Sequence, residues 1–208
     1  MQTLYYIILV PMVYLAFLVF IVGTVVQIGR ILHRPKFIPT LKIYPEKHPV
    51  WLWTLLDTFL LPTVRRHNIV LWFFLMTLHI CILLLIIGHL ELMSDFRILQ
   101  VWEHEIFLGR GLVGLLMTVA LIFLMFRRFV SPVKDLSVPE DYFLLILLML
   151  TVIFGSEMDW ARRWYDYSEM GVSEYRAYFQ GLLVLKPAIG GVTKAGHSFM
   201  MAAHVFFA

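Results

Sequence analysis

The chain has 208 residues, of which 61% are hydrophobic and 15% are charged, and its formal net charge is +3. Soluble domains average about 45–50% apolar and about 25% charged residues, so this composition excludes a water-soluble globule. The single cysteine, Cys81, excludes an intrachain disulfide and an iron–sulfur cluster held by this chain, because such a cluster normally needs four thiolates. The basic residues are sorted among loops and form no patch, which excludes nucleic-acid binding.

Five apolar runs predict an all-α integral membrane protein, a five-helix transmembrane bundle whose fifth helix is cut short. The first four runs approach the roughly 20 residues needed to cross about 30 Å of hydrocarbon. The first run has no Lys or Arg before it and no small-residue cleavage pattern after it, so we interpret it as a retained anchor. We expect a single membrane domain over residues 1–208, with helices at about 4–28, 69–93, 106–126, 142–158 and 196–208.

Two shorter apolar segments are predicted to lie in the membrane interface. The segment WLWTLLDTFLL, about residues 51–61, ends at Pro62 and is flanked by basic residues and tryptophans, which is typical of a helix at the inner interface. The segment YRAYFQGLLVL, residues 175–185, can lie at the outer interface in the same way.

Lysine and arginine in short loops are retained on the cytoplasmic side of a membrane, and their distribution predicts the orientation of this chain. Seven of them lie between residues 30 and 66, and Arg127, Arg128 and Lys134 follow the third run. The loop between the second and third runs carries more acidic than basic residues, so we expect this loop and the amino terminus outside. The mixed charges of residues 159–196 weaken this prediction without reversing it.

Two histidines, His79 and His89, lie within the second apolar run, in the stretch LHICILLLIIGH. An ionisable group at membrane depth is costly and is a functional candidate by default. Ten helical residues advance about 15 Å and rotate the side chain by about 80°, so both rings can face one bundle interior at two depths. Imidazole is an axial ligand of haem iron, and facing helices of a bundle build cofactor sites. Two unrelated histidines, each hydrogen-bonded to a neighbouring helix, are the alternative.

A bis-histidine haem needs ligands from another helix, and the fifth run offers His197 and His204. Seven helical residues separate this pair by about 10.5 Å and about 20°, which is roughly the width of one porphyrin, so we expect only one of them to bind iron. The histidines of the basic inner segment, His33, His48 and His67, are interpreted as solvated loop residues.

Several motifs resemble one family. LHICILLLIIGH resembles the ligand-bearing helix of the respiratory nitrate reductase gamma-subunit family, and FRRFVSPVK, residues 126–134, resembles that family's inner loop. LSVPEDYFLLILLMLTVIFG, residues 136–155, looks closer still to the membrane cytochrome b subunit of the dissimilatory sulfite-reduction complex. FMMAAHVFFA is similar to the start of the family's fifth helix, so the resemblance covers about residues 65–208.

The resemblance implies a dihaem b subunit in the cytoplasmic membrane of a prokaryote, which exchanges electrons between membrane quinone and a cytoplasmic iron–sulfur subunit. Further membrane or periplasmic subunits and sulfite- or sulfur-type anaerobic respiration are implied as well. His79 would serve an inner haem and His89 an outer haem, whose second ligand maps onto His204, with His197 as the fallback. The family's second ligand on the fifth helix lies several turns further on, at a position that this sequence lacks.

The carboxyl end of the sequence predicts a continuation. Residues 197–208 would rise only about 18 Å as a helix, against about 30 Å of hydrocarbon. A chain ending there would leave its carboxylate and last carbonyls in lipid. We therefore expect the native protein to continue beyond Ala208, where the missing ligand of the inner haem would lie.

Two surfaces are candidates for the quinone and for the partner subunit. His104, Glu103 and Arg110, at the outer end of the third helix, can serve a quinone, because its oxygens need hydrogen-bonding partners and its oxidation needs a proton acceptor. Solvated loop charges, with Arg110 reaching the interface, are the alternative. The basic inner surface of residues 30–68 and 127–135 is the candidate docking surface for the iron–sulfur subunit.

Three classes of function remain open at this stage, namely an electron-transfer cytochrome, a haem-free membrane anchor and a small transporter. The scarcity of carboxylates in the apolar runs and the lack of an inverted repeat argue against the transporter. Hydrolases are excluded by the lack of a Gly-x-Ser-x-Gly motif, a phosphate-binding loop or a metal-spaced Cys/His cluster. In the cytochrome, substrate chemistry would occur on other subunits.

Overall fold

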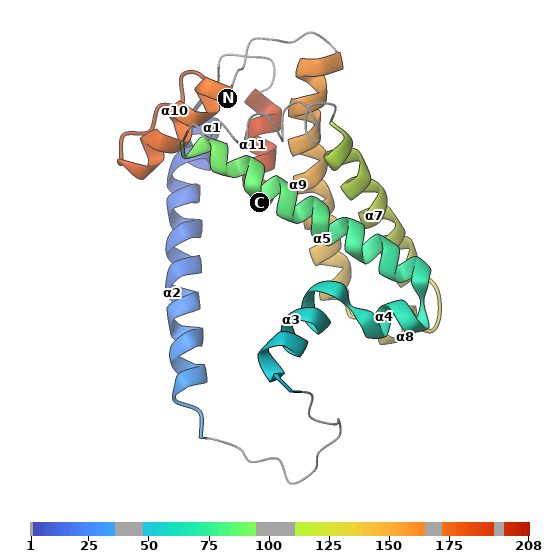
Figure 1. Cartoon of the computed structure of the whole chain (residues 1–208). Helices are drawn as coiled ribbons and strands as arrows, with labels where there is room; N and C mark the ends of the chain where they lie inside the picture. The colour runs from blue at the N-terminus through green and yellow to red at the C-terminus, as the bar shows by residue number, and fades with distance from the viewer. Residues whose placement is uncertain (1, 36–47, 95–110, 165–171, 194–197) are drawn as a thin grey trace. The chain divides into compact units, whose positions relative to one another are not determined.

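The computed structural model describes residues 2–35, 48–94, 111–164, 172–193 and 198–208, and the regular structure within these ranges is entirely helical (Figure 1). In chain order the elements are α1 (Gln2–Ile7), the π-helical turn η1 (Ile8–Met12), α2 (Val13–Leu32), α3 (Val50–Leu60), α4 (Pro62–His67), α5 (Ile69–His89), the 3-10 turn η2 (Leu90–Leu92), α7 (Leu112–Arg128), α8 (Val133–Leu136), α9 (Pro139–Trp164), α10 (Val172–Leu183) and α11 (Ser198–Phe207).

Three helical stretches are long and apolar enough to cross a membrane. They are Gln2–Leu32, which joins α1, η1 and α2, then Ile69–His89, and Pro139–Trp160 within α9. The helices α3 and α11 are apolar but shorter. With no strand in the described ranges, the chain is an all-α membrane protein, as its composition predicts.

The helix predicted at about 142–158 is longer at both ends, since α9 runs from Pro139 to Trp164. At its start, proline occupies the first helical position, where its missing N–H costs nothing, and the Asp141 carboxylate accepts the N–H of Val138 at 3.2 Å. At its other end, polar residues continue the helix beyond the apolar run because neither glycine nor proline interrupts it there. Hydropathy thus underestimates this helix.

The first span contains a local irregularity at Pro11, which lies inside the π-helical turn η1. Proline lacks an N–H and its ring clashes with the preceding turn, and π-turns are a common way to absorb such a disruption. The N–H of Val13 donates to Val10 O instead of the Leu9 O that a regular α-helix would use. The Leu9 carbonyl accepts a buried hydrogen bond of 2.6 Å from the Tyr178 hydroxyl on α10.

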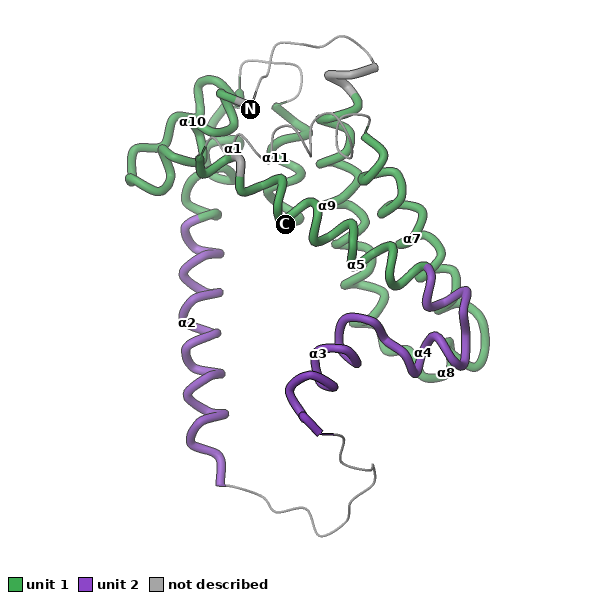
Figure 2. The backbone as a smooth tube through the Cα atoms, in the orientation of Figure 1, with its two compact units in different colours: residues 1–13, 74–208 green, residues 14–73 purple. Residues whose placement is uncertain are grey.

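The described chain divides into two compact units, residues 1–13 with 74–208, and residues 14–73 (Figure 2). In the larger unit, α9 packs against α7 on one side and against α11 on the other (Figure 1). Its core joins residues of α5, α7 and α9, namely Leu78, Cys81, Val113, Met117, Ala120, Leu121 and Val152. The single membrane domain over residues 1–208 stays a prediction.

Close packing within this core depends on a small residue and on an aromatic pair. A Cβ at Gly114 of α7 would clash with Ser156 Oγ on α9, so glycine allows these helices to approach closely. Phe74 of α5 stacks on Phe123 of α7 with ring centroids 3.9 Å apart. Helix association in lipid depends on such contacts, because hydrocarbon chains are as apolar as the side chains that they replace.

The smaller unit holds α2, α3, α4 and the first turn of α5. The bounds of α3 coincide closely with the helix predicted at about 51–61, and its interfacial position stays a prediction. The indole N–H of Trp72 donates to Leu60 O at 2.8 Å, and the Arg65 guanidinium lies 5.3 Å from the centre of the same ring. Asn68 caps α5 by accepting the N–H of Leu71 at 2.8 Å.

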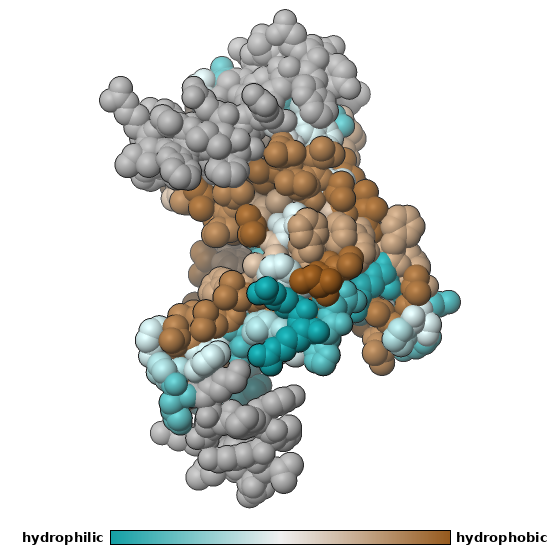
Figure 3. All heavy atoms as spheres, turned by 45° about the vertical axis from the view of Figure 1, so that its right-hand side comes forward, coloured by the Kyte–Doolittle hydropathy of each residue, from teal (hydrophilic) through white to brown (hydrophobic). Residues whose placement is uncertain are grey.

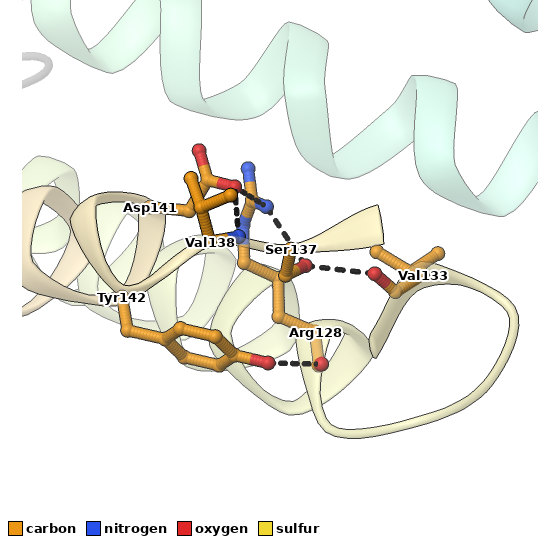
Figure 4. Close-up of polar contacts among 6 residues, drawn as sticks. All are labelled: Arg128, Val133, Ser137, Val138, Asp141 and Tyr142. Atoms are coloured by element: carbon orange, nitrogen blue, oxygen red, sulfur yellow. Dashed lines mark hydrogen bonds and ion pairs between the residues drawn. The ribbon is translucent and has the colours of Figure 1, made fainter. Parts of the chain in front are cut away.

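The loop between α7 and α9 is fixed by a network of polar contacts (Figure 4). Arg128 pairs with Asp141 at 2.9 Å and donates to Ser137 Oγ at 3.1 Å. Ser137 in turn donates to Val133 O at 2.8 Å, and the Tyr142 hydroxyl donates to Arg128 O at 2.7 Å. These contacts hold the segment that resembles the family's inner loop in one conformation.

Hydrophobic side chains cover much of the described surface on the face drawn in Figure 3, and hydrophilic side chains gather in a separate zone of that face. Large apolar residues of the spans are widely exposed, for example Phe20 at 69% and Phe143 at 61%. In water such a surface would be an aggregation hazard. In a bilayer it matches the hydrocarbon.

Candidate functional site

Both histidines of α5 make the same local hydrogen bond. The Nδ1 atoms of His79 and His89 lie 2.6 Å from the carbonyl oxygens of Leu75 and Leu85, one turn earlier. Because a carbonyl can only accept, Nδ1 carries the proton in the neutral ring and Nε2 keeps its lone pair. Within the described residues, neither Nε2 has a hydrogen-bonding partner. Both rings therefore present the nitrogen that can bind a metal.

His204 of α11 is oriented by a neighbouring helix. Its Nδ1–H donates to the main-chain carbonyl of Thr151 on α9 at 2.8 Å, and the side chain is partly buried. The Phe154 ring of α9 contacts two rings of α11. It lies edge-on to Phe199, with centroids 5.9 Å apart, and parallel to Phe207, with centroids 5.7 Å apart. These aromatic contacts fix α11 against α9 and so fix the root of the His204 side chain.

The structure brings His89 and His204 together from different helices. Their ring centroids are 6.3 Å apart and their planes differ by 23°. A metal ion held by two such imidazoles would take a bond of about 2 Å from a nitrogen of each ring, and a separation of about 6 Å between the ring centres leaves room for it. The pair, with both Nδ1 protons directed to carbonyls, fits bis-histidine ligation of an iron.

The hydrogen bond from Nδ1 to a carbonyl one turn earlier is not specific to the candidate ligands. His33, at the end of α2, makes the same bond from Nδ1 to a carbonyl one turn earlier, Gly29 O, at 2.8 Å. No metal role is predicted for His33, so the bond alone does not identify a ligand. The distinguishing feature of His89 is the second imidazole at 6.3 Å.

His79 differs from His89 in this respect. Its ring, which is exposed like that of His89, makes no ring contact with any residue that the structure describes. Among the described ranges there is also no group of three or more His, Cys, Asp or Glu side chains that could hold a metal ion. The assignment of His79 to an inner haem stays a prediction.

Several predicted site residues lie outside the described residues. These are the alternative ligand His197, the quinone candidates His104, Glu103 and Arg110, and the lysines Lys36 and Lys42 of the inner segment.

An apolar groove of about 370 Å³ lies in the larger unit. It is formed by α1, η1, α9 and α11, and its lining includes Phe154, Ala203 and Phe206. The groove therefore shares two helices, α9 and α11, with the contact between His204 and Thr151.

Two residues that contact His204, Thr151 and Gly155, were not predicted as part of the site. Thr151 acts through its main-chain carbonyl, which no side-chain pattern reveals. Gly155 carried a weak signal, because a glycine inside a helical apolar run costs about 1 kcal/mol relative to alanine and usually has a packing or functional reason.

The fold and this pair of imidazoles define an all-α membrane protein with a candidate haem site. The sequence matches the family described as nitrate reductase gamma subunit over residues 67–208. The chain belongs to this family, and it is accordingly a haem b-type membrane cytochrome subunit of a respiratory oxidoreductase, associated with other subunits of its complex. No curated protein and no solved structure matches the chain significantly.

Proposed function

We propose that this chain binds two haems b and passes electrons between membrane quinone and a cytoplasmic iron–sulfur subunit, in sulfite- or sulfur-type anaerobic respiration. The observation that carries the proposal is the His89 and His204 pair, with ring centroids 6.3 Å apart. Haem b supplies an iron that accepts and returns one electron. His89 and His204 would hold this iron, and the surrounding residues of the chain would tune its potential.

The role of each side chain follows from its surroundings. His89 and His204 offer Nε2 while Nδ1 donates to a carbonyl, which strengthens each imidazole as a ligand. His79 offers the same nitrogen about 15 Å further along α5, and we assign it to the second haem on the inner side.

Substitution of the paired histidines tests the haem proposal. In the membrane complex, His89→Ala and His204→Ala should each remove the same haem from reduced-minus-oxidised spectra, because each variant deletes one of its two ligands. His33→Ala is the matched control, since His33 makes the same local hydrogen bond at the end of α2. Spectra unchanged in both variants would instead support a haem-free anchor whose histidines serve only packing.

The quinone part of the proposal concerns the outer side. We assign proton acceptance from a quinol to His104, with Glu103 and Arg110 beside it, because these polar residues follow the outside loop and precede an apolar run. His104→Gln should slow quinol-driven haem reduction at least about tenfold, while dithionite reduction stays unchanged. Equal rates for the variant and the parent protein would remove His104 from this role.

The partner part concerns the basic inner surface, residues 30–68 and 127–135. The Arg128 network gives this loop a fixed form, which suits a docking site because little conformational entropy is lost on binding. Lys134, Lys36 and Lys42 should crosslink to an iron–sulfur protein in native membranes. Crosslinks from these lysines to lipid or to other copies of the chain alone would contradict the docking proposal.

The orientation proposed here is that of a multi-pass protein of a prokaryotic cytoplasmic membrane with its amino terminus outside. The basic residues that follow α2 and α7 support this orientation. A cysteine-accessibility assay on intact cells tests it, because a cysteine near residue 3 should react with a membrane-impermeant reagent and one at residue 134 should not.

A further inference from the structure

We propose that α9 contains a seat for the imidazole of His204, formed by the main-chain carbonyl of Thr151 and the missing side chain of Gly155. Gly155 is then a positioning residue for the His89 and His204 pair. This inference rests on the proposed function for the purpose of the pair, whereas the seat itself consists of contacts among described residues.

The first half of the seat is a carbonyl that accepts a hydrogen bond from outside its own helix. In a regular α-helix the carbonyl of residue 151 accepts the N–H of residue 155. A carbonyl oxygen has a second lone pair, and here His204 Nδ1–H donates to Thr151 O at 2.8 Å. Side chains lean toward the amino end of a helix, so a side chain at position 155 would cover this oxygen. Glycine leaves it open.

The second half of the seat is space. A Cβ at position 155 would lie 2.9 Å from Cε1 and 3.0 Å from Nδ1 of His204, whereas carbon atoms in good contact lie about 3.5–4.0 Å apart. With a Cβ at position 155, the His204 ring would have to move away from α9, and this movement would lengthen its hydrogen bond to Thr151. Alanine at this position is therefore incompatible with the observed ring position.

Backbone freedom does not explain this glycine. Gly155 lies in the interior of α9 and is not among the residues with positive φ, unlike Gly111. A glycine there costs about 1 kcal/mol relative to alanine, and the imidazole occupies the space that the glycine leaves. Accommodation of the His204 ring therefore explains why α9 contains a glycine that lowers the stability of the helix.

The consequence for His204 is control of both orientation and basicity. A hydrogen bond from Nδ1–H to a carbonyl fixes the tautomer, holds the ring plane and raises the electron density at Nε2. A more basic axial nitrogen stabilises the oxidised iron, so the seat lowers the reduction potential of the haem held by this pair. Loss of such outer contacts typically weakens metal binding about 10–100-fold.

A double-mutant cycle tests the seat without relying on haem. In the full chain within its membrane complex, Gly155→Ala should lower the thermal midpoint of the native protein. In the His204→Ala background the same change should be neutral or mildly stabilising, because the clash is gone and alanine favours the helix. Equal destabilisation by Gly155→Ala in both backgrounds would overturn the proposal.

Gly114→Ala is the matched control for this cycle. Its Cβ would clash with Ser156 Oγ on α9, so this variant disturbs the packing of α9 without touching His204. It should destabilise the protein by the same amount with or without His204. If the destabilisation by Gly114→Ala depended on His204 as strongly as that by Gly155→Ala, the coupling would reflect general packing of α9. That result would also contradict the proposed seat.

Spectroscopy then tests the positioning role. Gly155→Ala should weaken haem retention at this pair about tenfold or more and should shift the ferric low-spin EPR signal, which responds to the angle between the two imidazole planes. His204→Nδ-methylhistidine removes the donor to Thr151 but keeps Nε2, and it should raise the midpoint potential. The outcomes separate the two proposals. If His204→Ala loses the haem but Gly155→Ala leaves the EPR signal and the midpoint potential unchanged, the positioning role of Gly155 is refuted and the haem proposal remains.

If the haem spectrum is unaffected by His204→Ala, the haem proposal is refuted. The double-mutant cycle would still test whether Gly155 accommodates the His204 ring.

Discussion

The middle of α5 and its last residue carry the same side chain in the same local geometry but face different surroundings. His79 and His89 both donate from Nδ1 to a carbonyl one turn earlier, at 2.6 Å. Among the residues that the structure describes, His89 but not His79 lies near another imidazole, and that imidazole is hydrogen-bonded to a third helix, α9. Local helix geometry sets which nitrogen is available, whereas the packing of α11 on α9 sets which histidine gains a partner.

The largest expected effect is a difference between the absorbance spectra of variants at these two histidines. His79→Ala should remove one haem and His89→Ala the other, because each deletes an axial ligand of a different site. Redox titration of each variant in the membrane complex should resolve a single remaining haem, with a different midpoint potential in each case. Loss of the same spectral component in both variants would contradict the prediction that His79 and His89 bind different haems.

A smaller effect is expected from the core that lies between α5, α7 and α9. Leu121 is 1% exposed, and Leu121→Ala should lower the stability of the native protein by about 2–4 kcal/mol through a cavity. Both haems should remain at low temperature, since neither His79 nor His89 belongs to the core cluster that contains Leu121. Thermal unfolding monitored by haem absorbance checks this, with exposed Leu136→Ala as the control. A selective loss of one haem at low temperature would mean that the core supports only one of the two histidines.

The smallest effect is expected at the loop between α7 and α9. Asp141→Ala removes the ion pair to Arg128 and the capping acceptor of α9, and it should cost about 1–2 kcal/mol because the pair is partly exposed. Neither haem spectrum should change. Chemical denaturation followed by circular dichroism measures the cost, with Asp135→Ala as a control for an exposed carboxylate. A spectral shift in Asp141→Ala would connect this loop to the haem site.

The sequence was sufficient for the class of fold and for the helix that carries the histidines. An apolar run of spanning length with two ionisable residues identifies α5 without tertiary information. The bounds of α9 were underestimated because hydropathy marks the lipid-matched part of a helix and not its hydrogen-bonded ends. His204 was identified by resemblance to a family motif, and its closeness to His89 depends on the packing of α11.

The seat of His204 was beyond sequence reasoning for a different reason. Every residue has a main-chain carbonyl, so the sequence does not distinguish that of Thr151. Gly155 is one of several glycines in apolar stretches. Its meaning appears only when the ring that fills its space is known. Helix interiors whose glycines have ordinary φ values are therefore worth inspecting for an imidazole from a neighbouring helix.

The hydrogen bond from Tyr178 to Leu9 has a consequence for the time course of biosynthesis. Its donor and acceptor are 169 residues apart in the chain. At about 5–20 residues per second, the first span waits roughly 8–34 s after its own synthesis before the hydroxyl that completes its irregular turn leaves the ribosome. During that interval the Leu9 carbonyl lacks the hydrogen bond from Tyr178. A Tyr178→Phe variant should therefore leave nascent chains sensitive to protease for longer at this turn, which pulse-chase proteolysis would detect.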